Sequence, residues 1–387
     1  MVVIGGAIVG SAVATFLAAR PDFDGRIVVV ERDPTYRTSS TTLSAASIRL
    51  QFSTPLNIEI SRFGVEVVRH PERFLAVDGE APDVDFVENG YLFLATDAGL
   101  GTLEHNHAVQ RSLDVPVALL SPTELRRRFE WMTTDDLAGA SLGLSDEGWF
   151  DAYALLQGFR RRARSLGVTE LVGEVTGMDL DGERVAAVRL ADGSRIESDW
   201  VVNAAGPRAA EVAAMAGVAM PVRPRKRFVY HFEAPVRLPA APLTIDPSGV
   251  YFRPEGPAYL TGYSPHGDDP DPDTLDLVVD RSRFESHVWP ALAHRVPAFD
   301  RLRLLDAWAG HYEMNTLDHN AIVGPHPRLR NLLLANGFSG HGLQQAPAVG
   351  RGLAEWIAAG RYESLDLSPL GYERIDRGEP IVELNVV

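Results

Sequence analysis

The first thirty residues place the strongest constraint on how this chain can fold. A short apolar run, Val2-Val3-Ile4, leads into Gly5-Gly6-Ala7-Ile8-Val9-Gly10 and then into an alanine-rich stretch from Ser11 to Arg20. A second apolar run from Ile27 to Val30 ends on Glu31. Strand, glycine turn, helix, strand and terminal acid in this order are typical of a unit that binds an adenine dinucleotide.

Each residue type in this motif has a physical role. Gly5 permits the tight turn, Gly10 lets helix and strand pack closely, and the first helical amides direct partial positive charge at a pyrophosphate. Glu31 would accept a hydrogen bond from a ribose hydroxyl. Ala7 replaces the middle glycine and weakens the match, which leaves a βαβ unit with a plain glycine turn as the alternative. We predict cofactor contacts at Gly5, Ala7, Ile8, Gly10, Glu31 and Arg32.

Composition narrows the class of protein. With 387 residues, 45% of them hydrophobic, the chain suggests two or three domains with a large core. The formal net charge of −15 argues against nucleic-acid or anionic-membrane partners. No apolar run reaches the ~18 residues of a membrane span, and no basic leader precedes the first strand, so we expect a cytoplasmic protein.

The reactive residues exclude several chemistries. The chain has no cysteine, so it has no disulfide, no thiolate metal site and no cysteinyl bond to a cofactor. Lys226 is its single lysine. The histidines lack the spacing of metal ligands on a helix, and we predict no metal.

The remaining periodicities predict an α/β protein in which two domains interleave. Antiparallel strands are expected at Val84 to Val87 and Tyr91 to Leu94, and helices after the caps Ser121 and Asp151. Strands and proline-rich turns are expected from 221 to 306, with an acidic turn at 267–273. We assign 1–73, 146–217 and 308–375 to a Rossmann-like domain, 74–145 and 218–307 to a mostly antiparallel substrate domain, and 376–387 to a tail.

A second glycine-rich turn lies near the C-terminus. The apolar strand Leu332 to Ala335 is followed by Asn336-Gly337-Phe338-Ser339-Gly340-His341-Gly342-Leu343-Gln344-Gln345, which opens a helix to about Ala358. Three glycines ahead of a helix N-terminus make an anion site. Its target is expected to be another part of the same cofactor.

These stretches together resemble the FAD-dependent amine and amino-acid oxidoreductases, which include D-amino acid dehydrogenase, glycine oxidase, sarcosine oxidase and dimethylglycine dehydrogenase. The resemblance rests on Gly5 to Glu31, Ser44 to Phe52, Val201 to Pro207 and Asp318 to Ala358. Residues 309–318 and 337–347 are similar to a branch of the family associated with assembly of mitochondrial complex I.

The resemblance implies non-covalent FAD beneath a roof formed by the antiparallel sheet. It adds cofactor contacts at Ser39, Ser40, Thr41, Val175, Ala205, Gly206, Gly340, His341, Gly342, Leu343 and Gln344. The helix N-terminus at 340–344 would stabilise negative charge on the flavin N1 and C2 carbonyl. His341 is expected to contribute mainly its backbone.

The implied reaction is hydride transfer from the carbon beside an amine nitrogen to flavin N5, which gives an imine that water hydrolyses. Arg49 is the first candidate to bind a substrate carboxylate or to act electrostatically beside the flavin, and Gln344 is a candidate for a neutral contact with that carboxylate. Tyr251 and Arg253 are candidates on the roof. The alternatives are a structural arginine at position 49 and an ordinary strand alternation at 251 and 253.

Three departures from the family qualify this interpretation. Sarcosine oxidases have a carboxylate-binding lysine where Gln344 stands, and their lysine over the flavin falls on an apolar residue near Leu260. Both losses favour a dehydrogenase over a fast oxidase. His311 falls near the position where those enzymes attach FAD through cysteine, and a histidyl bond is an alternative to a packed histidine.

Three functions therefore stay open. The first is an amine or amino-acid dehydrogenase or oxidase acting on an N-alkyl or cyclic amino acid. The second is an assembly or interaction protein that keeps FAD as a structural cofactor, and the third is a nicotinamide-dependent dehydrogenase. The nicotinamide-dependent alternative is disfavoured, because it assigns no function to the second glycine-rich turn. The expected partner is a small-molecule amine or amino acid. The electron acceptor and a homo-oligomer stay undetermined.

Overall fold

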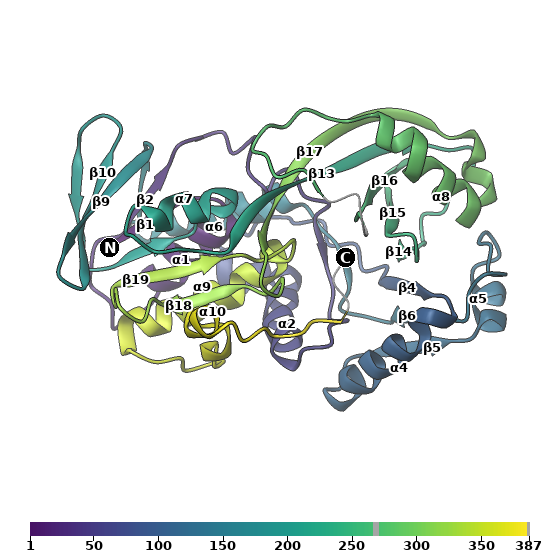
Figure 1. The fold of residues 1–387 in the computed structure, drawn as a ribbon, viewed down its shortest axis with the longest axis horizontal. Coiled ribbons are helices and arrows are strands. Elements are labelled where there is room, and N and C mark those ends of the chain that lie inside the picture. The colour runs from purple at the N-terminus through teal and green to yellow at the C-terminus, as the bar shows by residue number, and fades with distance from the viewer. Residues whose placement is uncertain (266–270, 385–387) are drawn as a thin grey trace.

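The computed structural model describes residues 1–265 and 271–384. Its two large sheets lie side by side as two lobes, and the long strands β13 (Val222–Glu233) and β17 (Arg303–Asn315) run from the second lobe toward the first (Figure 1). Residues 267–270 of the expected acidic turn, and 385–387 of the expected tail, lie outside the described residues.

The first sheet has the strand order β18-β19-β12-β1-β2-β8. β1 (Val2–Ile4) pairs in parallel with β2 (Val28–Glu31) and β12 (Val201–Asn203). β8 (Thr169–Val172) and β19 (Leu332–Asn336) extend the parallel set, and β18 (Ile322–Pro325) pairs antiparallel to β19. Parallel strands are covered on both faces, which explains their continuous apolar runs.

Different layers cover the two faces of this sheet. Helices α1 (Ile8–Ala18), α2 (Pro55–Arg69), α6 (Ala152–Ser165) and α9 (Gly342–Ala359) form one layer, in which α1 packs against α6 and α9. The other layer holds β9 (Val175–Asp181), β10 (Arg184–Leu190), β11 (Arg195–Glu197) and α7 (Ala209–Ala214). Because neighbouring strand residues point to opposite faces, Val3 packs with α1 while Val2 and Ile4 pack with β10 and α7.

The second sheet has the order β17-β13-β16-β15-β14-β4-β6-β5. Besides the two long strands it contains β16 (Ala258–Tyr263), β15 (Val250–Glu255), β14 (Leu243–Ile245), β4 (Tyr91–Ala95), β6 (Gly139–Gly143) and β5 (Val117–Leu120). Within the described part of this second sheet, β14 and β4 are the only strands that pair in parallel, and the other pairs are antiparallel. The predicted α/β class, with a Rossmann-like sheet and a mostly antiparallel second sheet, is confirmed.

Shorter elements complete the two lobes. α4 (Asp97–Ser112) and α5 (Pro122–Arg128) lie beside the β4-β6-β5 end of the second sheet, and α8 (Trp289–Arg295) packs on its aromatic core. β3 (Ser47–Ile48) pairs with β7 (Gly148–Trp149), and α3 (Pro71–Leu75) and α10 (Glu373–Arg377) are single short helices. No helix in the described ranges combines the length and the apolar character needed to cross a bilayer.

The structure differs from the sequence expectations at three places. Val84 to Val87 is not a strand and forms only a bridge from Val87 to Trp149, because Asp85 has a φ of +45° that interrupts an extended run. Residues 284–301 are largely helical, although strands and turns were expected from 221 to 306. The boundary placed between 307 and 308 falls inside β17, a single long strand at the edge of the second sheet.

Candidate functional site

A long cavity lies at the carboxyl ends of the central strands of the first sheet. We call it the first cavity; its empty space, counted to its open mouth, is about 1480 Å³. Its walls include the turn before α1, the ends of β2 and β12, the 38–47 loop and the start of α9. A crevice at this edge of an open parallel sheet is where dinucleotides bind.

Two helix N-termini line this cavity. α1 follows Ala7 and α9 follows His341, and neither of these residues caps its helix with a side-chain hydrogen bond. Ala7 and Ile8 contribute to one wall, and Gly340 and Gly342 to another. Because helix N-termini attract negative charge, the cavity offers two anion positions, although the first amide of α1, that of Ile8, already donates to Oγ1 of Thr41 at 3.3 Å.

Two glycines at these helix entrances have backbone conformations that other residues rarely adopt. Gly5 has a φ of +97° and Gly340 a φ of +96°. A side chain at Gly340 would overlap the ring of Tyr312, and one at Gly10 would overlap the carbonyl oxygen of Gly5. Glycine therefore keeps both entrances open and lets α1 lie close to β1.

Polar groups beside the α1 entrance and in the 38–47 loop suit a nucleotide. The Glu31 carboxylate accepts the amides of Gly6 and Asp33, each at 2.8 Å, and its remaining lone pairs can accept ribose hydroxyls. The buried hydroxyl of Ser40 lines the cavity and has no hydrogen-bond partner among the described residues. The helix entrances, the fixed acid and this hydroxyl together fit a dinucleotide.

A smaller cavity of about 500 Å³ joins the first one, and we call it the second cavity. The two share Ala45, Ser47, Tyr251, Tyr312 and Gly340 as lining residues. The other residues lining the second cavity are Arg49, Tyr91, Leu243, Ile245, His341 and Gln344. It is therefore a pocket with apolar and aromatic walls and one cationic side chain, next to the expected flavin end of the cofactor site.

Arg49 is held on several sides in the wall of the second cavity. It is only 3% exposed, and its guanidinium carbon lies 4.5 Å from the ring centre of Phe52 and 5.1 Å from that of Phe93. Its backbone amide donates to Oε1 of Gln344 at 2.8 Å. Burial lowers the pKa of this guanidinium, but an arginine with a lowered pKa still carries its charge at neutral pH.

His341 supports Arg49 with its ring. Arg49 Nη2 lies 2.9 Å from Nε2 of His341, and an arginine can only donate. Nε2 is therefore the acceptor, and a neutral ring carries its proton on Nδ1. Burial and the neighbouring Arg49 charge hold the pKa of His341 well below its usual range, in agreement with this neutral form.

Two tyrosines of the second cavity stay protonated at neutral pH. Burial raises the pKa of Tyr91 to about 12 and also raises the pKa of Tyr251. Their phenols can donate or accept hydrogen bonds, but they are not ionised bases. Among the described residues, no carboxylate lines this cavity.

The structure brings most of the predicted residues together. The first cavity is lined by Gly5, Ala7, Ile8, Glu31, Arg32, Ser39, Ser40, Thr41, Ala205, Gly206, Gly340, Gly342 and Leu343. The second is lined by Arg49, His341 and Gln344, and Tyr251 lines both. His311 lies in the wall of the first cavity, 7% exposed, and burial lowers its pKa.

Four of the positions singled out from the sequence do not line either cavity. Gly10 packs against β1, and Val175 belongs to the apolar core on the opposite face of the first sheet. Arg253 donates to the carbonyl of Ala45 at 3.1 Å and lies over Trp149, so the 45–46 loop separates it from both cavities. Leu260 is a buried residue of the second sheet.

Sequence reasoning missed several residues that the fold brings to these cavities. Tyr91, Leu243 and Ile245 come from β4 and β14, and Arg227, Tyr312 and Glu313 come from β13 and β17. Tyr312 and Glu313 lie in 309–318, a stretch that contributed to the family resemblance, but that resemblance assigned them no site role. The other four stand in strands without a functional motif. Only the pairing of distant strands places them over the expected flavin.

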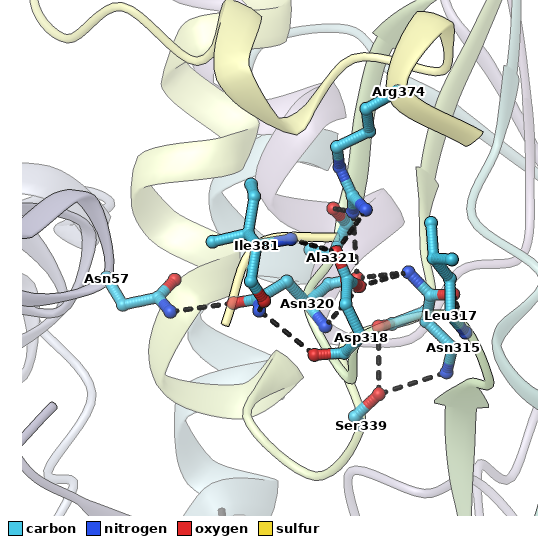
Figure 2. A network of polar contacts seen from close by, with 10 residues as sticks. Asn57, Asn315, Leu317, Asp318, Asn320, Ala321, Ser339, Arg374 and Ile381 are labelled. Atoms are coloured by element: carbon cyan, nitrogen blue, oxygen red, sulfur yellow. Dashed lines mark hydrogen bonds and ion pairs between the residues drawn. The ribbon is translucent and has the colours of Figure 1, made fainter. Parts of the chain in front are cut away.

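A buried polar network supports the loop that opens α9. Figure 2 shows Asn315 bonded to Ser339 in this loop, to Asp318 and to the carbonyl of Asn320. Arg374 of α10 forms an ion pair with Asp318, and Asn320 reaches Asn57 of α2 at 2.8 Å. The loop is therefore tied to elements from three separate parts of the chain.

Within 1–265 and 271–384, no cluster of His, Asp or Glu could hold a metal ion.

Comparison with known proteins gives matches along most of the chain. A family profile described as FAD dependent oxidoreductase matches residues 1–356. FAD-dependent oxidoreductase domain-containing protein 1 of Bos taurus is 43% identical, covering 99% of this chain and 86% of that protein. Mitochondrial sarcosine dehydrogenase of Mus musculus is 29% identical, covering 94% of this chain and 40% of that protein.

Solved structures give matches of similar extent. L-proline dehydrogenase from P. horikoshii has a TM-score of 0.86 and 28% identity, and the match covers 98% of both chains. Glycine oxidase from Geobacillus kaustophilus has a TM-score of 0.81 and 22% identity, covering 96% of this chain and 97% of the other. The second likeness shows a shared fold.

Proposed function

The chain belongs to the family of FAD-dependent oxidoreductases, and on that premise we propose that it oxidises the C–N bond of a small N-alkyl or cyclic amino acid. FAD is the cofactor, held without a covalent link in a chain that has no cysteine. When bound, FAD would supply the oxidant for removal of a hydride from the carbon beside the amine nitrogen. The resulting imine is hydrolysed by water.

The observation that carries this proposal is the position of Arg49. Arg49 lies in the wall of the second cavity, which shares five lining residues with the first. A guanidinium binds a carboxylate through two parallel hydrogen bonds, so Arg49 would fix one end of an amino acid and leave its amine carbon near the junction of the cavities. Gln344 supports the backbone of Arg49 rather than adding a second charge.

The surrounding side chains determine where the amine proton goes. Nε2 of His341 is occupied by Arg49, and Tyr91 and Tyr251 stay protonated, so none of these three accepts a proton at neutral pH. We infer that the amine loses its proton to water before it is oxidised. The phenols and the apolar side chains of Leu243 and Ile245 then surround a neutral amine.

Two considerations support a dehydrogenase acting on a secondary amine. The single lysine, Lys226, pairs with Asp276 at 2.7 Å and does not line either cavity, so it is not positioned to activate oxygen. Proline and sarcosine, in the names of two similar proteins, are both secondary amines with a carboxylate. A pocket with one cation and aromatic walls suits that class.

The first experiment is an anaerobic titration of the purified protein with amino acids, N-methyl amino acids and cyclic amines. We expect one substrate class to bleach the flavin absorbance near roughly 450 nm, and slow recovery in air would support a dehydrogenase. A yellow protein that no amine reduces would favour the interaction role. A colourless protein that cannot be reconstituted with FAD would contradict the family assignment as well.

Replacing Arg49 tests the carboxylate contact. We expect Arg49→Ala to raise KM by about a hundredfold or to abolish turnover while FAD stays bound, because a charged hydrogen-bonded pair is lost. Arg49→Lys, which keeps the charge, should lose less. Proline and pyrrolidine form a matched substrate pair, and the variant should discriminate between them far less than the wild type. Unchanged kinetics with proline would remove Arg49 from the site.

A further inference from the structure

Glu147 is a fully buried carboxylate behind the second cavity. It lies in the turn between β6 and β7 with 0% exposure. Oε1 accepts the backbone amides of Leu50 at 2.8 Å and Gln51 at 3.0 Å, and Oε2 accepts the Gln51 side-chain amide at 2.8 Å. One carboxylate thus holds three donors from the two residues that follow Arg49.

The surroundings of Glu147 are built to receive its carboxylate. A side chain at Gly143 on β6 would overlap the Glu147 carboxylate, so glycine leaves the necessary space. Gln51 also accepts the hydroxyl of Ser141 at 2.6 Å and reaches the carbonyl of Tyr91 at 3.3 Å. The segment after Arg49 is therefore tied to β4 and β6 of the second sheet.

The hydrogen bonds to Glu147 belong to a row of three consecutive backbone amides, those of residues 49–51, that side chains hold in place. The Arg49 amide is held by Gln344 of α9, and the next two amides are held by Glu147. Three consecutive amides are thus fixed by side chains from the two lobes. Because the guanidinium reaches the second cavity from this backbone, the direction of the backbone sets where the charge lies.

Burying a carboxylate here is costly. Burial raises the pKa of Glu147 to about 7, although hydrogen bonds from Gln51 and Leu50 and the charge of Arg49 act to lower it. An apolar side chain would avoid that cost but could not accept the amides, which would then be left unpaired. The need to accept the amides of residues 50 and 51 therefore explains why a carboxylate is buried at this position.

We propose that Glu147 is a positioning residue for Arg49, whose carboxylate fixes the 49–51 backbone so that the guanidinium meets a substrate carboxylate in the second cavity. This inference rests on the proposed function, because it assigns Arg49 to the substrate. It adds a contact across the two lobes: the substrate-binding charge depends on a residue from the β6–β7 turn.

Two variants separate position from charge. Glu147→Asp keeps the charge but withdraws the carboxylate by one methylene, whereas Glu147→Gln keeps the length and an acceptor oxygen. The holoenzyme is titrated with benzoate and with its uncharged analogue benzamide, each followed by the change in flavin absorbance. We expect Glu147→Asp to weaken benzoate binding about tenfold and benzamide binding to stay within about threefold. Glu147→Gln keeps an acceptor for the two backbone amides but turns its NH2 toward the Gln51 side-chain amide, so it should weaken benzoate binding less than Glu147→Asp does.

A matched control and a second measurement complete the test. Glu355 is also buried and accepts two backbone amides, those of Glu363 and Ser364, near the far end of α9. Glu355→Asp should leave binding of both probes unchanged. Hydrogen exchange of the peptide containing Leu50 and Gln51 should be faster in Glu147→Asp than in the wild type.

The outcomes distinguish this inference from the proposed function. Equal loss of benzoate and benzamide, unchanged binding of both, or a larger effect of Glu147→Gln than of Glu147→Asp would overturn the positioning role. A wild type that binds neither probe would overturn it too. If benzoate binding responds as expected but no amine reduces the wild-type flavin, the proposed function fails and the positioning role stands.

Discussion

At the scale of single residues, the fold changes the protonation of the half-buried Glu313 at the wall of the first cavity. Glu313 of β17 lines the first cavity and accepts the amide of Gly337 at 3.1 Å. Burial raises its pKa to about 8. The folded protein therefore holds a proton at Glu313 at pH values where the unfolded chain, with a glutamate pKa of ~4.3, has released it.

The first prediction follows from that difference in proton binding. Between about pH 5 and pH 8 the native state binds more protons than the unfolded state, so the free energy of unfolding falls as pH rises. Glu313→Gln cannot ionise and should weaken this dependence, raising Tm relative to the wild type more at pH 9 than at pH 5. Thermal unfolding across this range measures it. Glu183→Gln, at an exposed acid, is the control, and parallel curves for Glu313→Gln and the wild type would contradict the prediction.

At the scale of elements, the start of α9 is where backbone geometry and cofactor binding meet. The β19–α9 loop passes through Gly340 with a positive φ, beneath the ring of Tyr312. The end of the same helix offers a natural comparison, since Gly360 has a φ of +71° and an added side chain there meets no atom within 4 Å.

We expect Gly340→Ala to lose FAD, because the methyl would displace Tyr312 and the loop at the cavity wall. Gly360→Ala should lose a similar ~1–2 kcal/mol of stability from its left-handed backbone but keep FAD. The ratio of flavin to protein absorbance after gel filtration measures the difference. Equal FAD content in the two variants would show that backbone strain alone, and not the wall, governs binding.

At the scale of the whole molecule, the C-terminal tail joins elements that are far apart in sequence. The Glu383 carboxylate accepts the amides of Ser53 and Thr54 and the side chain of Asn57 at the start of α2. α2 has no side-chain cap of its own from Thr54. The tail residue Ile381 is bonded to Asp318 and Asn320 of the network beneath α9 (Figure 2).

Removing this cap should loosen the contact between tail and helix. We expect Glu383→Ala to cost about 1–2 kcal/mol, the range of a lost N-cap, and to lower Tm by roughly 2–4 °C. Limited proteolysis should cut the variant faster near residues 379–384. Glu379→Ala removes an exposed tail acid bonded to Arg377 and is the matched control. Equal cleavage of both variants would contradict a capping role.

Sequence determined the parts of this protein that depend on local chemistry. Gly5 and Gly340 could be recognised because a tight turn and a positive φ each demand glycine, and Glu31 because an acid ends the second strand of the same motif. The caps at Ser121 and Asp151 were likewise correct. The strand expected at 84–87 failed because turn formation at Asp85 overrode alternation.

Only the tertiary structure decided which distant residues complete the site. No motif assigns Tyr91 or Tyr312 to a site, and they reach the cavities because strands far apart in sequence pair in one sheet. Glu147 lies behind the second cavity in the β6–β7 turn. The same packing turned Arg253 away behind Ala45, although Tyr251 two residues earlier faces both cavities. Local sequence fixes the backbone that receives a cofactor, whereas the identity of its neighbours depends on long-range pairing that no short motif encodes.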